Sequence, residues 1–143
     1  MATRQRRRKL LQRLQDPARS GVYRAARVDE IADAVKDSKL LLVRIPYAAK
    51  PQLLKNMASV LGFPDWFGHN WDALEDCLTD LSWRLAPGYV LLMESAQPGD
   101  DLGVLVDILR SAAESWAGRG KPFFAVFIDP QRRLPLPDLF RQS

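Results

Sequence analysis

The chain is poor in cysteine, histidine and long apolar runs. It has one cysteine, Cys77, and one histidine, His69, among 143 residues. A single cysteine excludes an internal disulfide and fits a reducing compartment. No apolar run reaches the length of about 18 residues that a membrane span needs, and the start lacks the apolar core of a signal peptide. We therefore expect a cytoplasmic protein of about one domain.

Convergent catalytic groups are also scarce. His69 lies near Asp65, Asp72 and Asp76 in sequence, but ligands from other segments are missing for a metal or acid–base site. The carboxylates could suggest a glycosidase, yet they follow one predicted exposed ridge with no apolar wall to raise a pKa. No Ser-His-Asp set and no glycine-rich phosphate loop is recognised. We expect no enzyme activity, metal or cofactor, and a hydrolase using His69 is the least favoured hypothesis.

Charge is distributed unevenly along the chain. Residues 1–27 hold nine basic groups and one acidic group, whereas residues 28–131 hold nine basic and fifteen acidic groups, a net charge of −6. The overall charge of +4 therefore hides an acidic domain behind a basic arm. We divide the chain into a basic N-terminal arm or helix at 1–20, an α/β domain at 21–131 and a C-terminal tail at 132–143.

The two terminal segments carry weaker signals than the domain. Leu10, Leu11 and Leu14 recur at helical spacing among arginines, which predicts a frayed or loosely docked helix. An arm that binds RNA or a membrane surface is the minority interpretation. The tail, with Leu134-Pro135-Leu136-Pro137, is expected to be extended or loosely docked.

Apolar patterning predicts a small α/β fold. Three near-continuous apolar runs, at 40–45, 89–93 and 123–128, are typical of buried parallel strands. Helical periodicity predicts helices at 29–37 (capped by Asp29), at 50–61, at 101–117 and after Asn70. This order gives a mostly parallel three-stranded sheet with helices around it, and residues 22–25 form a candidate fourth, N-terminal strand.

The stretch 63–83 is the most unusual part of the sequence. It contains three of the four tryptophans and five carboxylates, and no lysine or arginine. Asn70 is a good N-cap for the helix that follows. On a helical wheel the apolar half holds Trp71, Ala73, Leu74, Cys77, Leu78 and Leu81. The other half holds Asp72, Glu75, Asp76, Thr79, Asp80, Ser82 and Trp83.

Asp72, Asp76 and Asp80 are spaced four residues apart, so like charges lie above one another on this helix. Each such pair costs a few tenths of a kcal/mol. One interpretation is a solvated acidic face, and the other is a docking surface for a basic partner. Trp66 and Phe67 just before the helix favour the second, because large aromatics beside charge are typical of binding anchors.

The segment WFGHNWDALEDCL, residues 66–78, resembles the signature of the barstar family, intracellular inhibitors of secreted ribonucleases. The resemblance implies three parallel strands with helices packed around them, and a helix and preceding loop that plug the cleft of a basic, barnase-like ribonuclease. Asp76 would take the place of the substrate phosphate, with Asp72 beside it at the rim. Trp66 and Phe67 would cover the active site, and Asn70 and Trp71 would make edge contacts.

The chain departs from the family's namesake at several positions. Glu75 stands where the namesake has an aromatic residue, and Asp80 where it has a glycine. Ser111 and Ser115 stand where a later helix offers acids. The full set of candidate partner-binding residues is Trp66, Phe67, Gly68, Asn70, Trp71, Asp72, Glu75, Asp76 and Asp80.

The function predicted from the sequence is ribonuclease inhibition by a protein that is a monomer when free. The alternative is an RNA-associated or regulatory binding module that acts through the basic arm. The two differ in the surface used, because inhibition needs the acidic helix and RNA association needs the arginines of residues 1–27.

Overall fold

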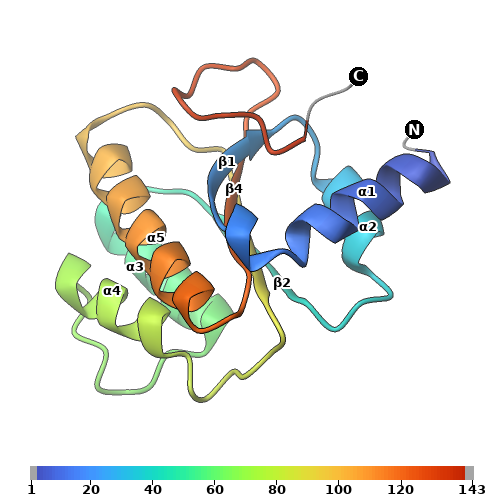
Figure 1. Cartoon of the computed structure of the whole chain (residues 1–143). Coiled ribbons are helices and arrows are strands. Elements are labelled where there is room, and N and C mark those ends of the chain that lie inside the picture. The colour runs from blue at the N-terminus through green and yellow to red at the C-terminus, as the bar shows by residue number, and fades with distance from the viewer. Residues whose placement is uncertain (1–2, 141–143) are drawn as a thin grey trace.

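The computed structural model describes residues 3–140, and in that part of the chain a four-stranded sheet lies between two layers of helices (Figure 1). The strands are all parallel and run in the order β1-β4-β3-β2. Their bounds are β1 Gly21–Ala25, β2 Leu41–Pro46, β3 Tyr89–Glu94 and β4 Phe123–Ile128. The predicted α/β class is confirmed, and the candidate N-terminal strand is the fourth strand, paired with β4.

Three helices cover one face of the sheet. They are α3 (Lys50–Leu61), α4 (Trp71–Asp80) and α5 (Asp100–Gly118). Alternate residues of the central strands, such as Leu91 in β3 and Ala125 in β4, point into this layer and are fully buried. Their neighbours Val90 and Val126 point to the other face and are equally buried. Burial on both faces explains why β3 and β4 are apolar without alternation.

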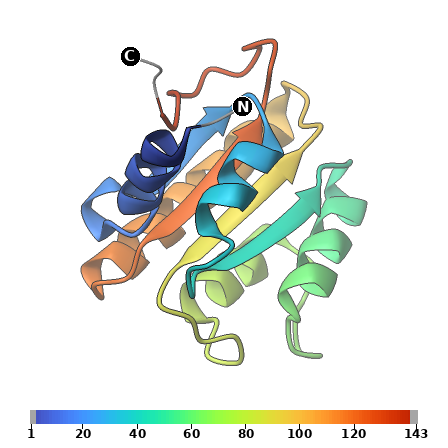
Figure 2. The ribbon, with the colours of Figure 1, turned by 90° about the vertical axis from the view of Figure 1, so that its right-hand side faces the viewer.

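The other face of the sheet is covered by α1 (Arg4–Leu14) and α2 (Val28–Val35), which lie side by side in front of the sheet in Figure 2. A short 3₁₀ turn, η1 (Pro17–Arg19), links α1 to β1. The apolar residues of α1 and α2 form a second core cluster with the sheet. The sheet therefore separates α1 from α4.

The N-terminal helix is firmly docked, whereas the sequence predicts a frayed or loosely docked helix. Leu10 and Leu14 are 1% and 0% exposed. Arg6 pairs with Glu30 of α2, and the Nε of Arg13 donates to the carbonyl of Leu139 at 2.6 Å. The two buried leucines and these polar contacts fix α1 on the domain.

Helix α2 begins earlier than the expected cap at Asp29. Arg27 is its N-cap residue and provides no side-chain cap. The carboxylate of Asp29 instead pairs with the Arg27 guanidinium at 2.9 Å, and the hydrogen bond from Arg27 lowers the pKa of Asp29. Asp29 thus lies in the first turn, where a negative charge is favoured by the helix dipole.

The C-terminal segment is docked as far as it is described, up to Phe140, whereas the sequence predicts an extended or loosely docked tail at 132–143. Leu134, Leu136 and Leu139 are buried. The carboxylate of Asp129 accepts from the backbone N–H groups of residues 133 and 134 and turns the chain back after β4. Arg24 of β1 exchanges backbone hydrogen bonds with residues 137 and 139, so this segment covers the outer edge of β1.

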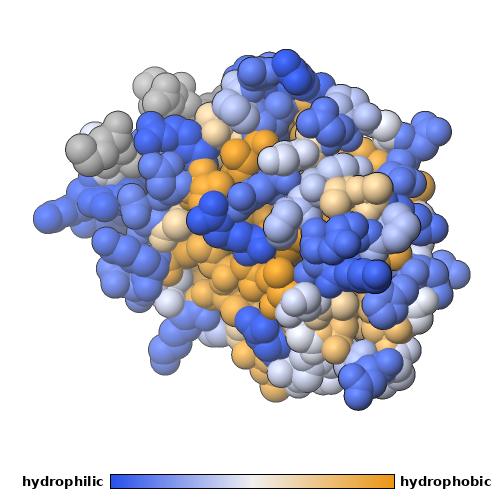
Figure 3. Space-filling model, turned by 180° about the vertical axis from the view of Figure 1, so that it is seen from behind, coloured by the Kyte–Doolittle hydropathy of each residue, from blue (hydrophilic) through white to orange (hydrophobic). Residues whose placement is uncertain are grey.

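The opposite edge of the sheet is less covered. Figure 3 shows the molecule from behind, and the middle of this side is apolar surface bordered by hydrophilic side chains. The strand at this edge is β2, and Leu40, Leu41 and Leu42 around its start are only partly buried. Arg44 and Glu94, paired across β2 and β3, add charge near this edge.

Candidate functional site

The start of α4 is set by the loop before it. Asn70 is the N-cap, and its Oδ1 accepts from the backbone N–H of Ala73 at 2.8 Å, which confirms the predicted cap. The Nδ2 of Asn70 lies so close to Gly68 that a Cβ there would be 3.0 Å away. His69 adopts a left-handed φ of 52°. This tight turn leads from the loop that carries Trp66 into the first residue of α4, Trp71.

The end of α4 is held by α5. The Nε1 of Trp116 donates to the carbonyl of Leu78 at 2.7 Å, and an Nη of Arg119 donates to the carbonyl of Thr79 at 2.6 Å. The Arg119 guanidinium also stacks 3.6 Å from the Trp116 ring and bonds to Ser115. Two carbonyls of the last turn of α4 thereby gain partners. Trp116 and Arg119 are positioning residues that the sequence did not reveal.

The acidic row of α4, defined as Asp72, Asp76 and Asp80, is exposed to solvent. Glu75 lies at the edge of this row and is partly buried. Among residues 3–140, no ion pair within 4.0 Å involves any of these four carboxylates. The charges therefore repel one another without compensation from the described part of the chain.

The aromatic residues at the site differ in exposure. Trp66 is 62% exposed, whereas Phe67 is 5% exposed and packs edge-on against Phe63 at 4.9 Å between ring centroids. Trp71 is partly buried, with Lys50 5.1 Å from its ring. Trp66 is thus accessible to a partner, whereas the buried ring of Phe67 packs under the loop and supports it in the free protein.

Trp83 was placed with the acids on the helical wheel, and this placement is wrong. The helix ends at Asp80, and Leu81 has a left-handed φ of 46°, which turns the chain inward. The Nε1 of Trp83 donates to the carbonyl of Leu61 at 3.1 Å. Its ring lies 6.4 Å from that of Trp66, so it supports the exposed aromatic.

Residues 46–128 match the protein family described as Barstar (barnase inhibitor), and this match covers more than half of the chain. The chain belongs to the barstar family. Barstar relatives are inhibitors of ribonucleases rather than enzymes. The match includes the whole segment from the last residue of β2 to the end of β4, and therefore all nine candidate partner-binding residues. The chain matches no curated protein and no solved structure.

The hypothesis of a hydrolase gains no support from the barstar-like domain. His69 is exposed, and its ring packs 4.7 Å from that of Phe67. Within residues 3–140, no three His, Cys, Asp or Glu side chains are grouped so that they could hold a metal ion.

No helix in the same described range is long and apolar enough to cross a membrane.

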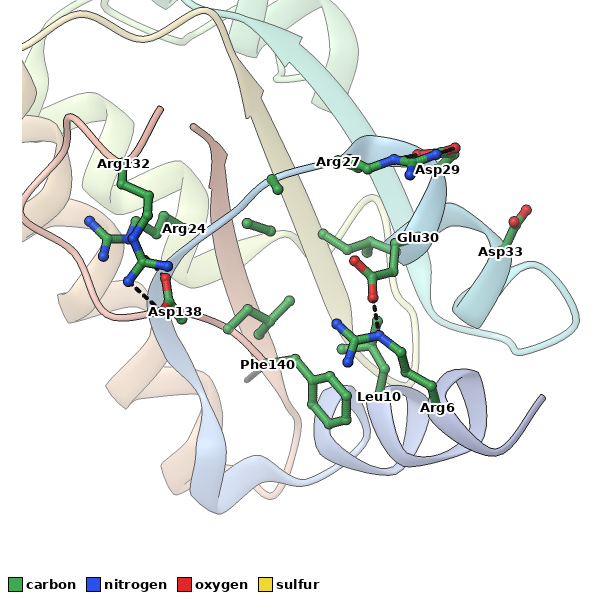
Figure 4. Close-up of a pocket in the computed structure, with 14 residues that line it drawn as sticks. Arg6, Leu10, Arg24, Arg27, Asp29, Glu30, Asp33, Arg132, Asp138 and Phe140 are labelled. Carbon is green, nitrogen blue, oxygen red and sulfur yellow. Dashed lines mark hydrogen bonds and ion pairs between the residues drawn. The ribbon is translucent and has the colours of Figure 1, made fainter. Parts of the chain in front are cut away.

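A cavity of about 500 Å³ lies away from α4, between α1, α2 and the C-terminal segment (Figure 4). Its charged side chains neutralise one another: Arg6 pairs with Glu30, and Asp138 lies between Arg24 and Arg132. The hydrogen bond from Arg24 is the main cause of a lowered pKa of Asp138. We interpret these ion pairs as structural contacts that hold the two terminal segments on the domain.

Cys77 lies on the buried side of α4, directly beneath the acidic row. Its side chain is fully buried. Burial, together with the charges of Asp76 and Asp80, raises the pKa of the thiol to about 11. The thiol therefore stays protonated at neutral pH and fills the core.

Cys77 is expected to be unreactive in the folded protein. A water-soluble disulfide reagent at about pH 8 should label it only after unfolding, because the thiol is buried and protonated. Cys77→Ala should lower the free energy of unfolding by about 1–2 kcal/mol, since it leaves a small cavity. Urea unfolding measures the second effect. Rapid labelling of the native protein would contradict the assignment of Cys77 to the core.

Proposed function

We propose that this barstar-family protein inhibits a basic ribonuclease of the barnase type by inserting α4 and the loop before it into the RNA-binding cleft. The observation that supports this most directly is the uncompensated acidic row of α4 beside the exposed Trp66. Cations that bind RNA phosphates in a nuclease would neutralise those carboxylates. The acidic charge of residues 28–131 adds long-range attraction for such an enzyme.

Asp76 is proposed as the central contact. It lies between Asp72 and Asp80 in the row and is exposed. The resemblance of residues 66–78 to the barstar signature implies that it takes the place of the substrate phosphate. Asp72 lies one turn earlier and would meet basic groups at the rim. Glu75 and Asp80 are proposed as peripheral contacts, and Glu75 is the more buried of the two.

The loop before α4 is proposed to cover the nuclease active site with Trp66. Gly68 and Asn70 shape the turn, and Trp71 lies at the edge of the contact. Phe67 was expected to help cover the active site, but it is buried and packs against Phe63, so its proposed role is to support the loop that carries Trp66. An inhibitor of this kind would act in the cytoplasm, as immunity against a toxic ribonuclease, and would be a monomer when free.

The direct test is an RNA-cleavage assay in which the protein is titrated against barnase and other basic secreted ribonucleases. We expect stoichiometric loss of cleavage with at least one enzyme. A mixture in which the substrate RNA is first saturated with this protein controls for shielding of the RNA itself. The absence of inhibition of every enzyme at micromolar concentrations would overturn the proposal.

Association with the ribonuclease should depend steeply on salt. We expect the association rate to fall by at least about tenfold between 10 mM and 1 M salt, because screening shortens the reach of the acidic row from roughly 30 Å to roughly 3 Å. The dissociation rate should change much less. Stopped-flow fluorescence of the tryptophans measures both rates. A salt effect confined to dissociation would contradict steering by this surface.

A further inference from the structure

The inhibitor proposal leaves the basic residues of α1 without a role. This helix contains six basic residues and no acidic residue. Arg6 and Arg13 are used within the fold, in contacts with Glu30 and with the carbonyl of Leu139. The remaining four have no ion pair or hydrogen bond from their side chains with residues 3–140, and we call them the α1 basic face: Arg4, Arg7, Arg8 and Lys9.

The α1 basic face is presented on a fixed helix. Arg4, Arg8 and Lys9 are exposed on the side away from the core, and Arg7 is partly buried at the margin of the side that Leu10 and Leu14 anchor in the core. The Thr3 hydroxyl caps the helix by accepting from the N–H of Arg6 at 3.0 Å. A partner would therefore meet these cations already arranged, with little further loss of backbone entropy.

This arrangement is unfavourable for the isolated helix. Four basic residues lie near the N-terminus of α1, where the helix dipole opposes positive charge. Arg4 and Arg8 also repel each other across one turn, at a spacing of four residues. A partner with negative charge would remove both penalties.

The α1 basic face and the acidic row lie on opposite sides of the sheet. Residues of α1 pack on one face of the sheet and residues of α4 on the other. Figure 1 shows α1 and α4 on opposite sides of the molecule, with the sheet between them. A polyanion on α1 would therefore be kept apart from the carboxylates of α4.

We propose that the α1 basic face binds the phosphodiester backbone of a nucleic acid strand. Arg4 and Arg8 are separated by about 6 Å along the axis at about 1.5 Å per residue, and each guanidinium can bind a phosphate through two hydrogen bonds. Exposed Gln5 and Gln12 offer amide donors between the cations. No aromatic residue lies on α1 to stack on bases, so the binding is independent of sequence.

An anionic membrane fits this surface less well than a strand does. Membrane-binding helices insert their apolar side between lipids. The apolar side of α1 is occupied, because Leu10 and Leu14 are buried against α2 and the sheet. Without insertion, a membrane would be held only by the four cations of the α1 basic face. Such a small group of cations fits the single row of phosphates on one strand better than a broad membrane surface.

Fluorescence anisotropy with a fluorescein-labelled oligouridylate, and with oligothymidylate in parallel, tests the proposal on the full chain. We expect binding at about 50 mM salt that weakens roughly 20- to 50-fold at about 200 mM salt, the slope for three or four phosphate contacts on a single strand. The triple variant Arg4→Gln, Arg8→Gln, Lys9→Gln should bind at least about tenfold more weakly at the lower salt concentration. Glutamine preserves helix propensity, and circular dichroism confirms the fold.

The matched control is the triple variant Lys36→Gln, Lys55→Gln, Arg110→Gln, which removes the same charge from exposed positions outside α1. It should weaken binding by less than about threefold, and Asp76→Ala should not weaken it. Equal losses in the two triple variants, or no binding of the original protein at about 50 mM salt, would overturn the proposal.

Two further outcomes would assign the α1 basic face to a different partner and so overturn the proposal. One is α1-dependent binding to phosphatidylserine vesicles without binding to either oligonucleotide. The other is a concentration-dependent dimer, measured by sedimentation, that is lost both in the α1 triple variant and in Asp76→Ala. That result would mean that α1 of one copy meets the acidic row of a second copy.

Discussion

Asp76→Ala is expected to weaken binding to an inhibited ribonuclease by about 2–5 kcal/mol, or roughly 30- to 5,000-fold in Kd. In the proposed complex its carboxylate is desolvated among the nuclease's cations. Removal of one partner leaves those cations buried without a counter-charge, which is the main source of the cost. The range is that of buried interfacial ion pairs in general, among which the barstar–barnase complex is a known example.

The same substitution should leave the free protein intact. Asp76 is exposed and forms no ion pair with residues 3–140, and its loss relieves repulsion within the acidic row. The free energy of unfolding should therefore stay the same or rise by a few tenths of a kcal/mol. Kd from calorimetry or surface plasmon resonance, together with urea unfolding, separates the two effects.

Asp33→Ala is the matched control for Asp76→Ala. Asp33 is an exposed aspartate in the middle of α2, on the other side of the sheet, and it too forms no ion pair with the described residues. Its loss should change the Kd by less than about threefold, through long-range attraction alone. Equal effects of the two substitutions would show that net charge, rather than insertion of Asp76, governs binding.

Much of the fold follows from local patterns in the sequence. Helix α3 spans the predicted residues 50–61, because Pro51 suits its first turn and Gly62 ends it with a left-handed φ of 66°. Strand β4 spans the predicted residues 123–128, an apolar run closed by Asp129-Pro130. The N-cap Asn70 was equally clear. In each case the signal lies within a few residues of the boundary.

The errors at the candidate site have a common cause. No glycine or proline marks the end of α4, and Leu81 adopts a left-handed φ that is rare for its residue type, so the helical wheel was carried on to Trp83. Trp66 and Phe67 are adjacent aromatics, yet one is exposed and the other buried. Trp116 reaches α4 across 38 residues of sequence. Each of these features depends on contacts between residues that are distant in sequence, so local sequence patterns do not predict it.

The close packing of the two terminal segments was also not predicted from the sequence. Leu10 and Leu14 were visible at helical spacing, but the arginines around them indicated a frayed or loosely docked helix. The missing information was the partner surface: the second face of the sheet, covered by α2 and closed by Leu139. Without α1 the buried residues Phe124 and Val126 would lose part of their cover. The family match begins only at residue 46, so it does not account for this helix.

Leu14→Ala is therefore expected to destabilise the protein by about 2–5 kcal/mol, the usual cost of truncating a fully buried leucine. Leu14 is 0% exposed, whereas Leu11 on the same helix is only partly buried. Leu11→Ala removes the same atoms from the same helix and should cost less than about 1.5 kcal/mol. Urea unfolding of both variants gives the comparison.

The pair of leucine variants distinguishes a docked α1 from a frayed arm. If α1 were frayed, both substitutions would be nearly neutral in the free energy of unfolding, because alanine favours a helix slightly more than leucine does. A large effect of Leu14→Ala with a small effect of Leu11→Ala requires the packing of α1 against the sheet. Ribonuclease binding should survive Leu14→Ala at temperatures where the protein remains folded, since α4 rests on the opposite face of the sheet and is held there by Trp116 and Arg119. A loss of binding by the folded variant would instead show that the two helix layers are coupled through the sheet.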